Sequence, residues 1–180
     1  MRYRAEKEKI VRRRAETDLP SRYGTFRAIA YENITNGETH VAMVLGEVRQ
    51  ATEPVMVRVQ TENITFAMFG SEIGEASAAI HSSLQKIAQE KRGVILYLRQ
   101  REHNLDLIHQ LETYKLMQEE GLDFAAARRA TGYGGQRDYG VGAQILNDLG
   151  VRKIRLLTNH PPRVTALEAF DLEITEIVSL

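Results

Sequence analysis

The sequence predicts a mixed α/β fold in which helices pack on a mixed β-sheet. Two observations support this class. Residues 25–60 alternate apolar and polar side chains, as strands do. Later segments carry apolar residues at helical spacing, and short apolar runs separate these segments. Strands thus come together first and then alternate with helices, the order expected when helices cover a sheet. The 180 residues are enough for one domain with a sizeable core.

The first 17 residues differ in composition from the rest of the chain. They contain seven Lys or Arg side chains and three Glu side chains. We interpret residues 1–17 as a basic arm or an exposed helix, and residues 18–180 as the folded domain. Contact with phosphate or with an acidic partner is one role for the arm. A solvated face, the usual role of a charge run, is the preferred one.

The folded body begins after Pro20 and Gly24. Alternating residues predict a hairpin of two strands, and β-branched residues predict a third strand. These strands are expected at Thr25–Asn33, His40–Val48 and Val55–Gln60. Helical spacing predicts a helix within Ser71–Lys91, and the apolar run Gly93–Leu98 is typical of a buried strand.

The second half of the sequence predicts four helices and two more strands. The helices are expected at Leu105–Glu120, Phe124–Thr131, Val141–Leu149 and near Val164–Phe170. Asp123 is a candidate N-cap for the second helix, and a Gly-rich turn at 132–135 precedes the third. The strands are expected at Lys153–Leu157 and near Glu173–Val178.

Composition and charge exclude several classes of protein. Lys plus Arg and Asp plus Glu number 24 each, so no net field attracts the chain to nucleic acid or to an anionic membrane. No apolar run is long enough to span a bilayer, and the first residues lack the apolar core of a signal peptide. We therefore expect a cytoplasmic protein. The chain has no cysteine, which excludes disulfides, thiolate nucleophiles and cysteine-bound metals.

One long run stands out at residues 137–146, which read Arg-Asp-Tyr-Gly-Val-Gly-Ala-Gln-Ile-Leu. In this run, and in the segments 19–24, 40–42, 57–59, 69–71, 96–100 and 148–159, the sequence from Thr17 to Leu180 resembles the GTP cyclohydrolase II family. That family converts GTP to a diaminopyrimidine, formate and pyrophosphate in riboflavin synthesis. The resemblance implies the family's fold and a homodimer, with an active site near residues 137–146.

The family's zinc ligands are absent from this chain. Three cysteines hold zinc in the family, and the metal lowers the pKa of the water that attacks the purine. The matching positions are Asn63, Gly74 and Ala76. We therefore expect no zinc. The candidate ligands for magnesium or manganese in place of zinc are Glu72, Glu75, His81 and His103. A phosphorylated substrate can also bring its own magnesium. The preferred interpretation of the two carboxylates is that they complement a helix dipole.

Two further departures affect the family's substrate pocket. The family's glycine-rich run after the strand at 93–98 is replaced here, with Arg101 at the position of a Glu and His103 at that of an Arg. The family's general-base Asp is Gly135 in this chain, whereas the neighbouring Arg, proposed as a nucleophile in the family, is retained as Arg137. These changes remove the residues that read guanine and the proton acceptor.

The candidate site residues form two groups. By resemblance, those expected to bind the substrate are Arg58, Thr61, Glu62, Arg101, Thr158 and Arg163. Those expected to act in catalysis are Arg137, Tyr114, His103, Glu102 and Asp106. Arg137 and Tyr114 match family positions. The other three enter together in the remodelled loop, and histidine titrates near neutral pH. An exposed loop without a catalytic role is an equally weighted interpretation of those three.

Three functions follow from these residues. The preferred one is an enzyme that binds a phosphorylated nucleotide-like or sugar-phosphate compound and catalyses hydrolysis, elimination or dehydration without zinc. The second is a non-catalytic nucleotide-binding or regulatory paralogue, and the third is GTP cyclohydrolase II activity itself. The first is preferred because the framework segments are kept while the metal ligands, the base-reading residues and the proton acceptor are all replaced.

Overall fold

The chain forms two compact units in a computed structural model. The structure describes residues 9–63, 65, 69–73, 76–99, 106–132, 139–159 and 171–180. Unit 1 comprises Met1–Glu62, Ala79–Arg99 and Asp138–Leu180, and unit 2 comprises Asn63–Ala78 and Gln100–Arg137. Unit 2 is therefore built from the two segments that interrupt unit 1 in the sequence.

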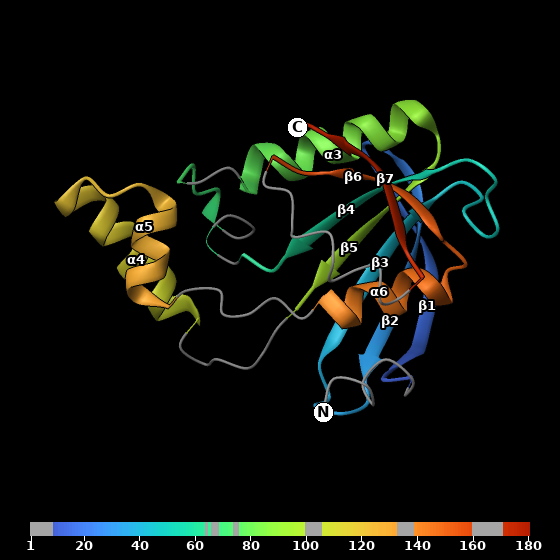
Figure 1. The fold of residues 1–180 in the computed structure, drawn as a ribbon, viewed down its shortest axis with the longest axis horizontal. Coiled ribbons are helices and arrows are strands. Elements are labelled where there is room, and N and C mark those ends of the chain that lie inside the picture. The colour runs from blue at the N-terminus through green and yellow to red at the C-terminus, as the bar shows by residue number, and fades with distance from the viewer. Residues whose placement is uncertain are drawn as a thin grey trace. The chain divides into compact units, whose positions relative to one another are not determined.

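Unit 1 contains a seven-stranded mixed sheet with the order β1-β2-β3-β5-β4-β6-β7 (Figure 1). The strands are β1 (Val11–Ser21), β2 (Gly24–Asn33), β3 (Thr39–Leu45), β4 (Val55–Thr61), β5 (Gly93–Leu98), β6 (Lys153–Leu157) and β7 (Glu173–Val178). Neighbouring strands from β1 through β5 pair antiparallel, whereas β5, β4, β6 and β7 pair parallel. The predicted α/β class and the six predicted strands are confirmed.

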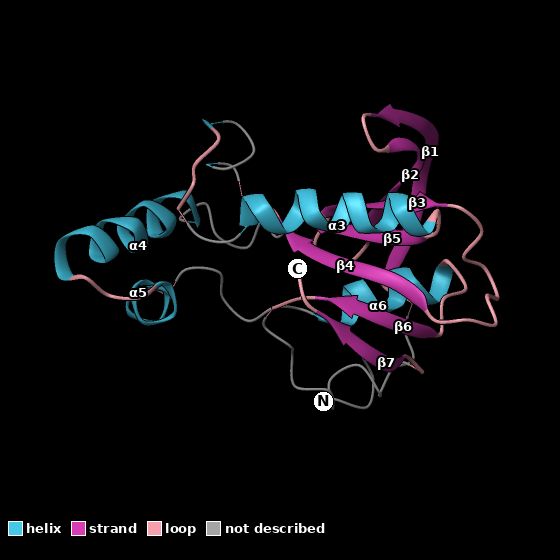
Figure 2. Cartoon of the chain, turned by 90° about the horizontal axis from the view of Figure 1, so that it is seen from above, coloured by secondary structure: helices cyan, strands magenta, loops and turns pink. Residues whose placement is uncertain are grey.

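Helices α3 (Ala76–Glu90) and α6 (Tyr139–Asp148) lie on either side of the parallel strands (Figure 2). Val57 and Leu96 point to the face that packs against α6, and Met56 and Ile95 point to the face that packs against Ile87 of α3. Both faces of β4 and β5 are thus covered. This explains why β5 shows a continuous apolar run instead of an alternating pattern.

The N-terminal segment differs from the expected arm or helix. Residues from Val11 onward form β1, which pairs with β2 along its length, from Val11 opposite Asn33 to Ser21 opposite Gly24. The interpretation of residues 11–17 as an arm outside the fold is therefore wrong, while residues 1–8 lie outside the described part. After Val11 every residue of β1 is exposed. Both faces of the strand carry polar groups, so the period-two pattern that marks a strand is missing from the sequence.

The basic side chains at the start of β1 lie in ion pairs within unit 1. The pairs are Lys9 with Asp148, Arg12 with Glu32, Arg13 with Glu16 and Asp148, and Arg14 with Glu32. All four basic side chains are substantially exposed, and the pairs with the partly exposed Glu16 and Glu32 are solvated and individually weak. The carboxylate of Asp148 is less exposed than those of Glu16 and Glu32. For the described residues, this arrangement agrees with the solvated-face interpretation of the charge run.

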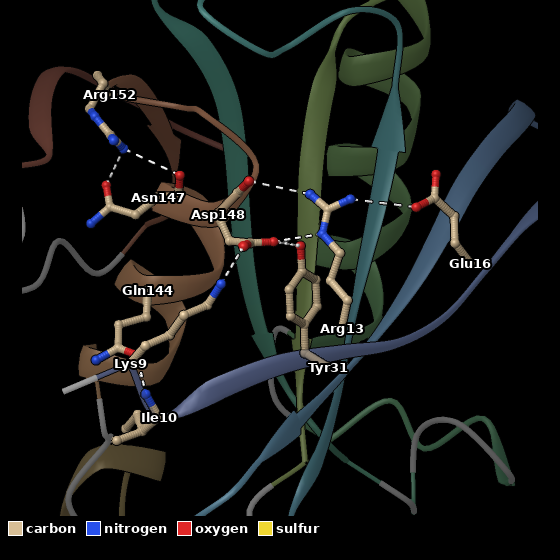
Figure 3. A network of polar contacts seen from close by, with 9 residues as sticks. All are labelled: Lys9, Ile10, Arg13, Glu16, Tyr31, Gln144, Asn147, Asp148 and Arg152. Atoms are coloured by element: carbon tan, nitrogen blue, oxygen red, sulfur yellow. Dashed lines mark hydrogen bonds and ion pairs between the residues drawn. The ribbon is translucent and has the colours of Figure 1, made fainter.

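Asp148, the last residue of α6, joins this helix to β1 and β2 (Figure 3). Its carboxylate accepts hydrogen bonds from Lys9 Nζ at 3.0 Å, Arg13 Nε at 2.6 Å and the Tyr31 hydroxyl at 2.9 Å. Partial burial acts to raise the pKa of Asp148, but the bonds from Arg13, Lys9 and Tyr31 outweigh it and hold the pKa below its ordinary value. Burial and the bond to Asp148 raise the pKa of Tyr31, so its hydroxyl remains a donor.

Unit 2 contains helices α4 (Asp106–Glu120) and α5 (Phe124–Thr131), both close to the predicted bounds. The predicted N-cap is confirmed, because the Asp123 carboxylate accepts from the backbone N–H of Ala126 at 2.7 Å. The predicted helix at 164–170 and most of the predicted turn at 132–135 lie outside the described residues. Within the described ranges, no helix combines the length and apolar composition needed to cross a lipid bilayer.

Candidate functional site

The candidate site in unit 1 lies where the parallel strands end. Strands β4, β5 and β6 run in the same direction, so their last residues Thr61, Leu98 and Leu157 share one edge of the sheet. From β4 the chain continues to β5 on one side, whereas from β6 it continues to β7 on the other side. The strand order therefore reverses between β4 and β6, and such a topological switch point is the usual position of ligands in open α/β sheets.

Arg58 connects β4 to the end of β6. Its Nη1 donates to the carbonyl of Leu157 at 3.0 Å, and its Nη2 donates to Gln60 Oε1 at 2.9 Å. The Gln60 amide in turn donates to the carbonyl of Thr61 at 2.9 Å. These bonds fix the plane of the guanidinium at the carboxyl edge, which is the geometry that a planar cation needs to bind an oxyanion through two contacts.

Thr158 follows β6 directly and lies beside the end of β7. Its backbone N–H donates to the carbonyl of Val178 at 3.0 Å, and the next side chain, Asn159, accepts from the backbone N–H of Leu180 at 2.9 Å. Because Arg58 binds the carbonyl that precedes Thr158, these two predicted substrate-binding residues are neighbours. Their proximity follows from the parallel pairing of β4 with β6.

Glu62 follows β4 and lies beside the end of β5. Its backbone N–H continues the ladder by donating to the carbonyl of Leu98 at 2.9 Å, and its carboxylate accepts from Arg99 Nε at 3.0 Å. Burial, followed by the charge of Glu62, raises the pKa of Tyr97 on β5 above its ordinary value. Glu62 and Arg99 are each more than one third exposed, so this pair is accessible to a ligand.

Arg99 was not among the residues predicted for the site, and its backbone has a buried partner. The backbone N–H of Arg99 donates to Nδ1 of His40 at 3.1 Å, and His40 is 1% exposed. Both residues lie in segments that resemble the family, and this resemblance is the sequence feature that could have identified them. Neither the apolar periodicity nor the motif spacing indicated that β3 and β5 would bring them together.

Tyr114 is buried within unit 2 in a group of polar side chains. Its hydroxyl lies 3.2 Å from Thr65 Oγ1 and accepts from Gln110 Nε2 at 3.0 Å. Thr65 donates to Asn63 Oδ1 at 2.9 Å. A hydroxyl has one proton, so Thr65 acts as acceptor toward Tyr114, and the bonds run in one direction from Gln110 through Tyr114 and Thr65 to Asn63.

The positions of the family's zinc ligands do not fit zinc. Asn63 offers only an amide, whose oxygen already accepts from Thr65, and Ala76 is the first residue of α3. Gly74 lies outside the described residues and has no side chain to offer. Of the alternative ligands, Glu72 is exposed and His81 Nδ1 is hydrogen-bonded to the Tyr23 hydroxyl at 2.8 Å. In the part of the chain that the structure describes, no three His, Asp or Glu side chains form a group suited to a metal ion.

Several predicted site residues fall outside the described part of the chain. They are Arg101, Glu102, His103, Arg137 and Arg163. Asp106 is the first residue of α4, and only its backbone is described. The structure therefore brings together four predicted residues at the carboxyl edge of unit 1, Arg58, Thr61, Glu62 and Thr158, and places Tyr114 in unit 2.

Residues 12–179 match the model of the GTP cyclohydrolase II family. The chain belongs to this family. The match begins within β1, which agrees with the assignment of β1 to the sheet. This chain lacks all three of the cysteines that bind zinc in the family, because it contains no cysteine.

Riboflavin biosynthesis proteins are similar to this chain over almost its whole length. The protein RibBA of Bacillus subtilis (strain 168) is 45% identical, and that of Bacillus mycoides (strain KBAB4) is 44% identical, each over 179 residues. The alignments cover 99% of this chain and 45% of each relative. The chain thus spans about half the length of these relatives.

A solved structure has a similar fold. It is RibBX from A. baumannii, described as a two-domain 3,4-dihydroxy-2-butanone 4-phosphate synthase. The TM-score is 0.62 at 26% sequence identity, and the match covers 99% of this chain and 42% of that one. The fold of the present family member therefore also occurs as part of a longer chain.

Proposed function

We propose that the chain is a zinc-independent member of the GTP cyclohydrolase II family that binds a phosphorylated nucleotide-like or sugar-phosphate compound. The observation that carries the proposal is the carboxyl edge of β4 and β6, where the oriented guanidinium of Arg58 lies beside Thr158. An arginine held in a fixed plane is suited to a phosphate group, which it can contact through two N–H groups at once.

The reaction proposed for this site is a hydrolysis, elimination or dehydration in which no protein-bound zinc takes part. Magnesium that arrives with the phosphates of the substrate is compatible with it. Arg137, His103, Glu102 and Asp106 remain the proposed catalytic residues, together with Tyr114. A homodimer is proposed on the family resemblance alone.

A non-catalytic binding or regulatory role is the second candidate. One finding favours it: RibBX, whose chain includes a part similar to this one, is described by a synthase activity and not by a cyclohydrolase activity. A part with a fold similar to this one therefore belongs to a chain that is described by a different activity. The two candidates share the anion site and differ in whether the bound compound is converted.

A thermal-shift experiment tests the anion site. Pyrophosphate, GTP and ribose 5-phosphate are the probes, and a probe at a hundred times its dissociation constant stabilises the folded state by about 2.7 kcal/mol. We expect Arg58→Gln to lose most of this shift, measured against the melting temperature of that variant without ligand. Arg12→Gln, which removes an exposed arginine of β1, is the matched control and should keep the shift. Equal shifts in both variants would show that Arg58 is only structural.

Product analysis separates the proposed reaction from the family's own. Incubation of the purified protein with GTP is expected to release no formate, because the thiolate-held metal that activates water in the family is missing. Formate release would instead assign the family's reaction to this chain. If the protein converts another phosphorylated compound, Arg137→Ala should abolish that conversion. A compound that binds but is not converted would support the regulatory role.

A further inference from the structure

One peptide group at the end of β5 is held from both neighbouring strands. Its carbonyl belongs to Leu98 and accepts from the backbone N–H of Glu62, which follows β4, at 2.9 Å. Its N–H belongs to Arg99 and donates to Nδ1 of His40 on β3 at 3.1 Å. The orientation of this peptide group therefore depends on one backbone bond and one side-chain bond.

The histidine replaces the backbone carbonyl that a longer β3–β5 ladder would supply. The pairing of these strands ends with Val41 opposite Tyr97, so Arg99 lies beyond the last pair. A backbone carbonyl accepts at every pH, whereas imidazole accepts at Nδ1 only when that nitrogen carries no proton. Because a backbone N–H can only donate, the bond from Arg99 requires the neutral ring of His40 with its proton on Nε2.

His40 is buried among titratable neighbours from three segments. The residue is 1% exposed, and the carboxylate of Glu38, which precedes β3, lies 3.8 Å from Nε2. On β2 the cross-strand partner is Tyr31, whose hydroxyl donates to α6. After β5, the guanidinium of Arg99 is paired with Glu62. A proton added to Nδ1 would turn this acceptor into a donor that faces the Arg99 N–H, and that N–H would lose its partner at a cost.

We infer that His40 is a positioning residue of the candidate site, and that only its neutral form fixes the pair of Glu62 with Arg99. Arg99 Nε donates to the Glu62 carboxylate at 3.0 Å, and the backbones of both residues are bonded through the peptide group that His40 holds. The imidazole thus sets the place of an accessible ion pair at the carboxyl edge without contacting a ligand. The inference rests on the proposed function in that Glu62 belongs to the proposed ligand site.

Two substitutions with opposite defects test the inference. His40→Phe keeps a ring but removes the acceptor, whereas His40→Asn loses volume but keeps an oxygen that can accept from Arg99. In NMR spectra of the protein without ligand, we expect the Arg99 amide to exchange about 5- to 30-fold faster in His40→Phe than in wild type. In His40→Asn this amide should keep most of its protection. The wild-type imidazole should show the Nε2–H tautomer.

The controls separate this role from general destabilisation. The amide of Ile95, within the β5 ladder, should not distinguish the two His40 variants. His109→Asn, at a partly exposed histidine of α4, should leave the Arg99 amide unchanged. On acidification, wild-type protection of Arg99 should fall as the charged imidazole of His40 appears, but protection in His40→Asn should not.

Three results would overturn the inference. They are an Nδ1–H tautomer of His40, an equal loss of Arg99 protection in the Phe and Asn variants, and wild-type protection that persists after the imidazole is charged.

A measurement with ligand connects the result to the site. The rise in melting temperature that GTP produces, taken against each variant without ligand, should be smaller in His40→Phe than in His40→Asn. Equal rises would show that the peptide group held by His40 does not position the site. The absence of any rise, in wild type as well, would contradict the proposed anion site and leave the NMR result unaffected, because that result is obtained without ligand.

Discussion

Gly46→Ala is expected to lower the free energy of unfolding by roughly 2–5 kcal/mol, from left-handed backbone strain together with a steric overlap. Gly46 follows β3 and has a φ of +69°, a region that side chains with a Cβ rarely adopt. A Cβ at this position would lie 2.4 Å from the carbonyl oxygen of Lys91. Lys91 belongs to the turn between α3 and β5, so a backbone atom of that turn would have to move. Urea unfolding followed by far-ultraviolet circular dichroism measures the loss.

Gly37→Ala is the matched control for this prediction. Gly37 has a similar φ of +73°, but no heavy atom lies within 4 Å of the position its Cβ would take. The backbone strain alone is expected to cost about 1–2 kcal/mol. The excess loss in the Gly46 variant then measures the contact between the β3 end and the α3–β5 turn. Equal losses in the two variants would mean that this close contact has no energetic importance.

Asp148→Asn is expected to lower the free energy of unfolding by about 2 kcal/mol at neutral pH, as is usual for hydrogen bonds to a charged group. The side chain is largely buried and receives bonds from Lys9, Arg13 and Tyr31. The substitution removes the negative charge that these donors share. Because the bonds connect α6 to β1 and β2, the loss should appear in the unfolding of unit 1.

The effect of Asp148→Asn should depend on pH in a defined direction. The pKa of Asp148 is lowered in the folded state from its ordinary value of 3.8, so the unfolded chain binds a proton more readily. The carboxylate therefore contributes stability above the unfolded pKa, and the contribution is lost as the pH falls through the folded pKa. The difference between wild type and variant should thus shrink toward strongly acidic pH. Asp18→Asn, an exposed site on β1, should change the unfolding free energy by less than about 0.5 kcal/mol at any pH.

The strands and helices with a buried face could be predicted from the sequence. The apolar run at β5 and the helical spacing in α4 and α5 reflect the burial of specific faces. By contrast, β1 could not be predicted, because its residues after Val11 are exposed on both faces and carry charges of both signs. Its conformation depends on pairing with β2, and local sequence patterns do not report such pairing.

The candidate site could be predicted only in part. Resemblance to the family provided Arg58, Glu62 and Thr158, and the parallel pairing of the strands then explains why they share an edge. The contact of Glu62 with Arg99 spans 37 residues and that of Thr65 with Tyr114 spans 49. Neither contact leaves a local pattern in the sequence, because each depends on how separate elements are placed in three dimensions.

The two segments that form unit 2 also contain the positions at which this chain lacks the family's zinc ligands, its glycine-rich run and its general base. Both leave the sheet at strand ends, so substitutions in them do not alter the residues that pack β4 and β5 between α3 and α6. The loss of the family's metal ligands, and the substitution of side chains near them, therefore need not destabilise unit 1. This topology therefore allows the residues of unit 2 to change in evolution while the sheet of unit 1 and its packing against α3 and α6 are kept.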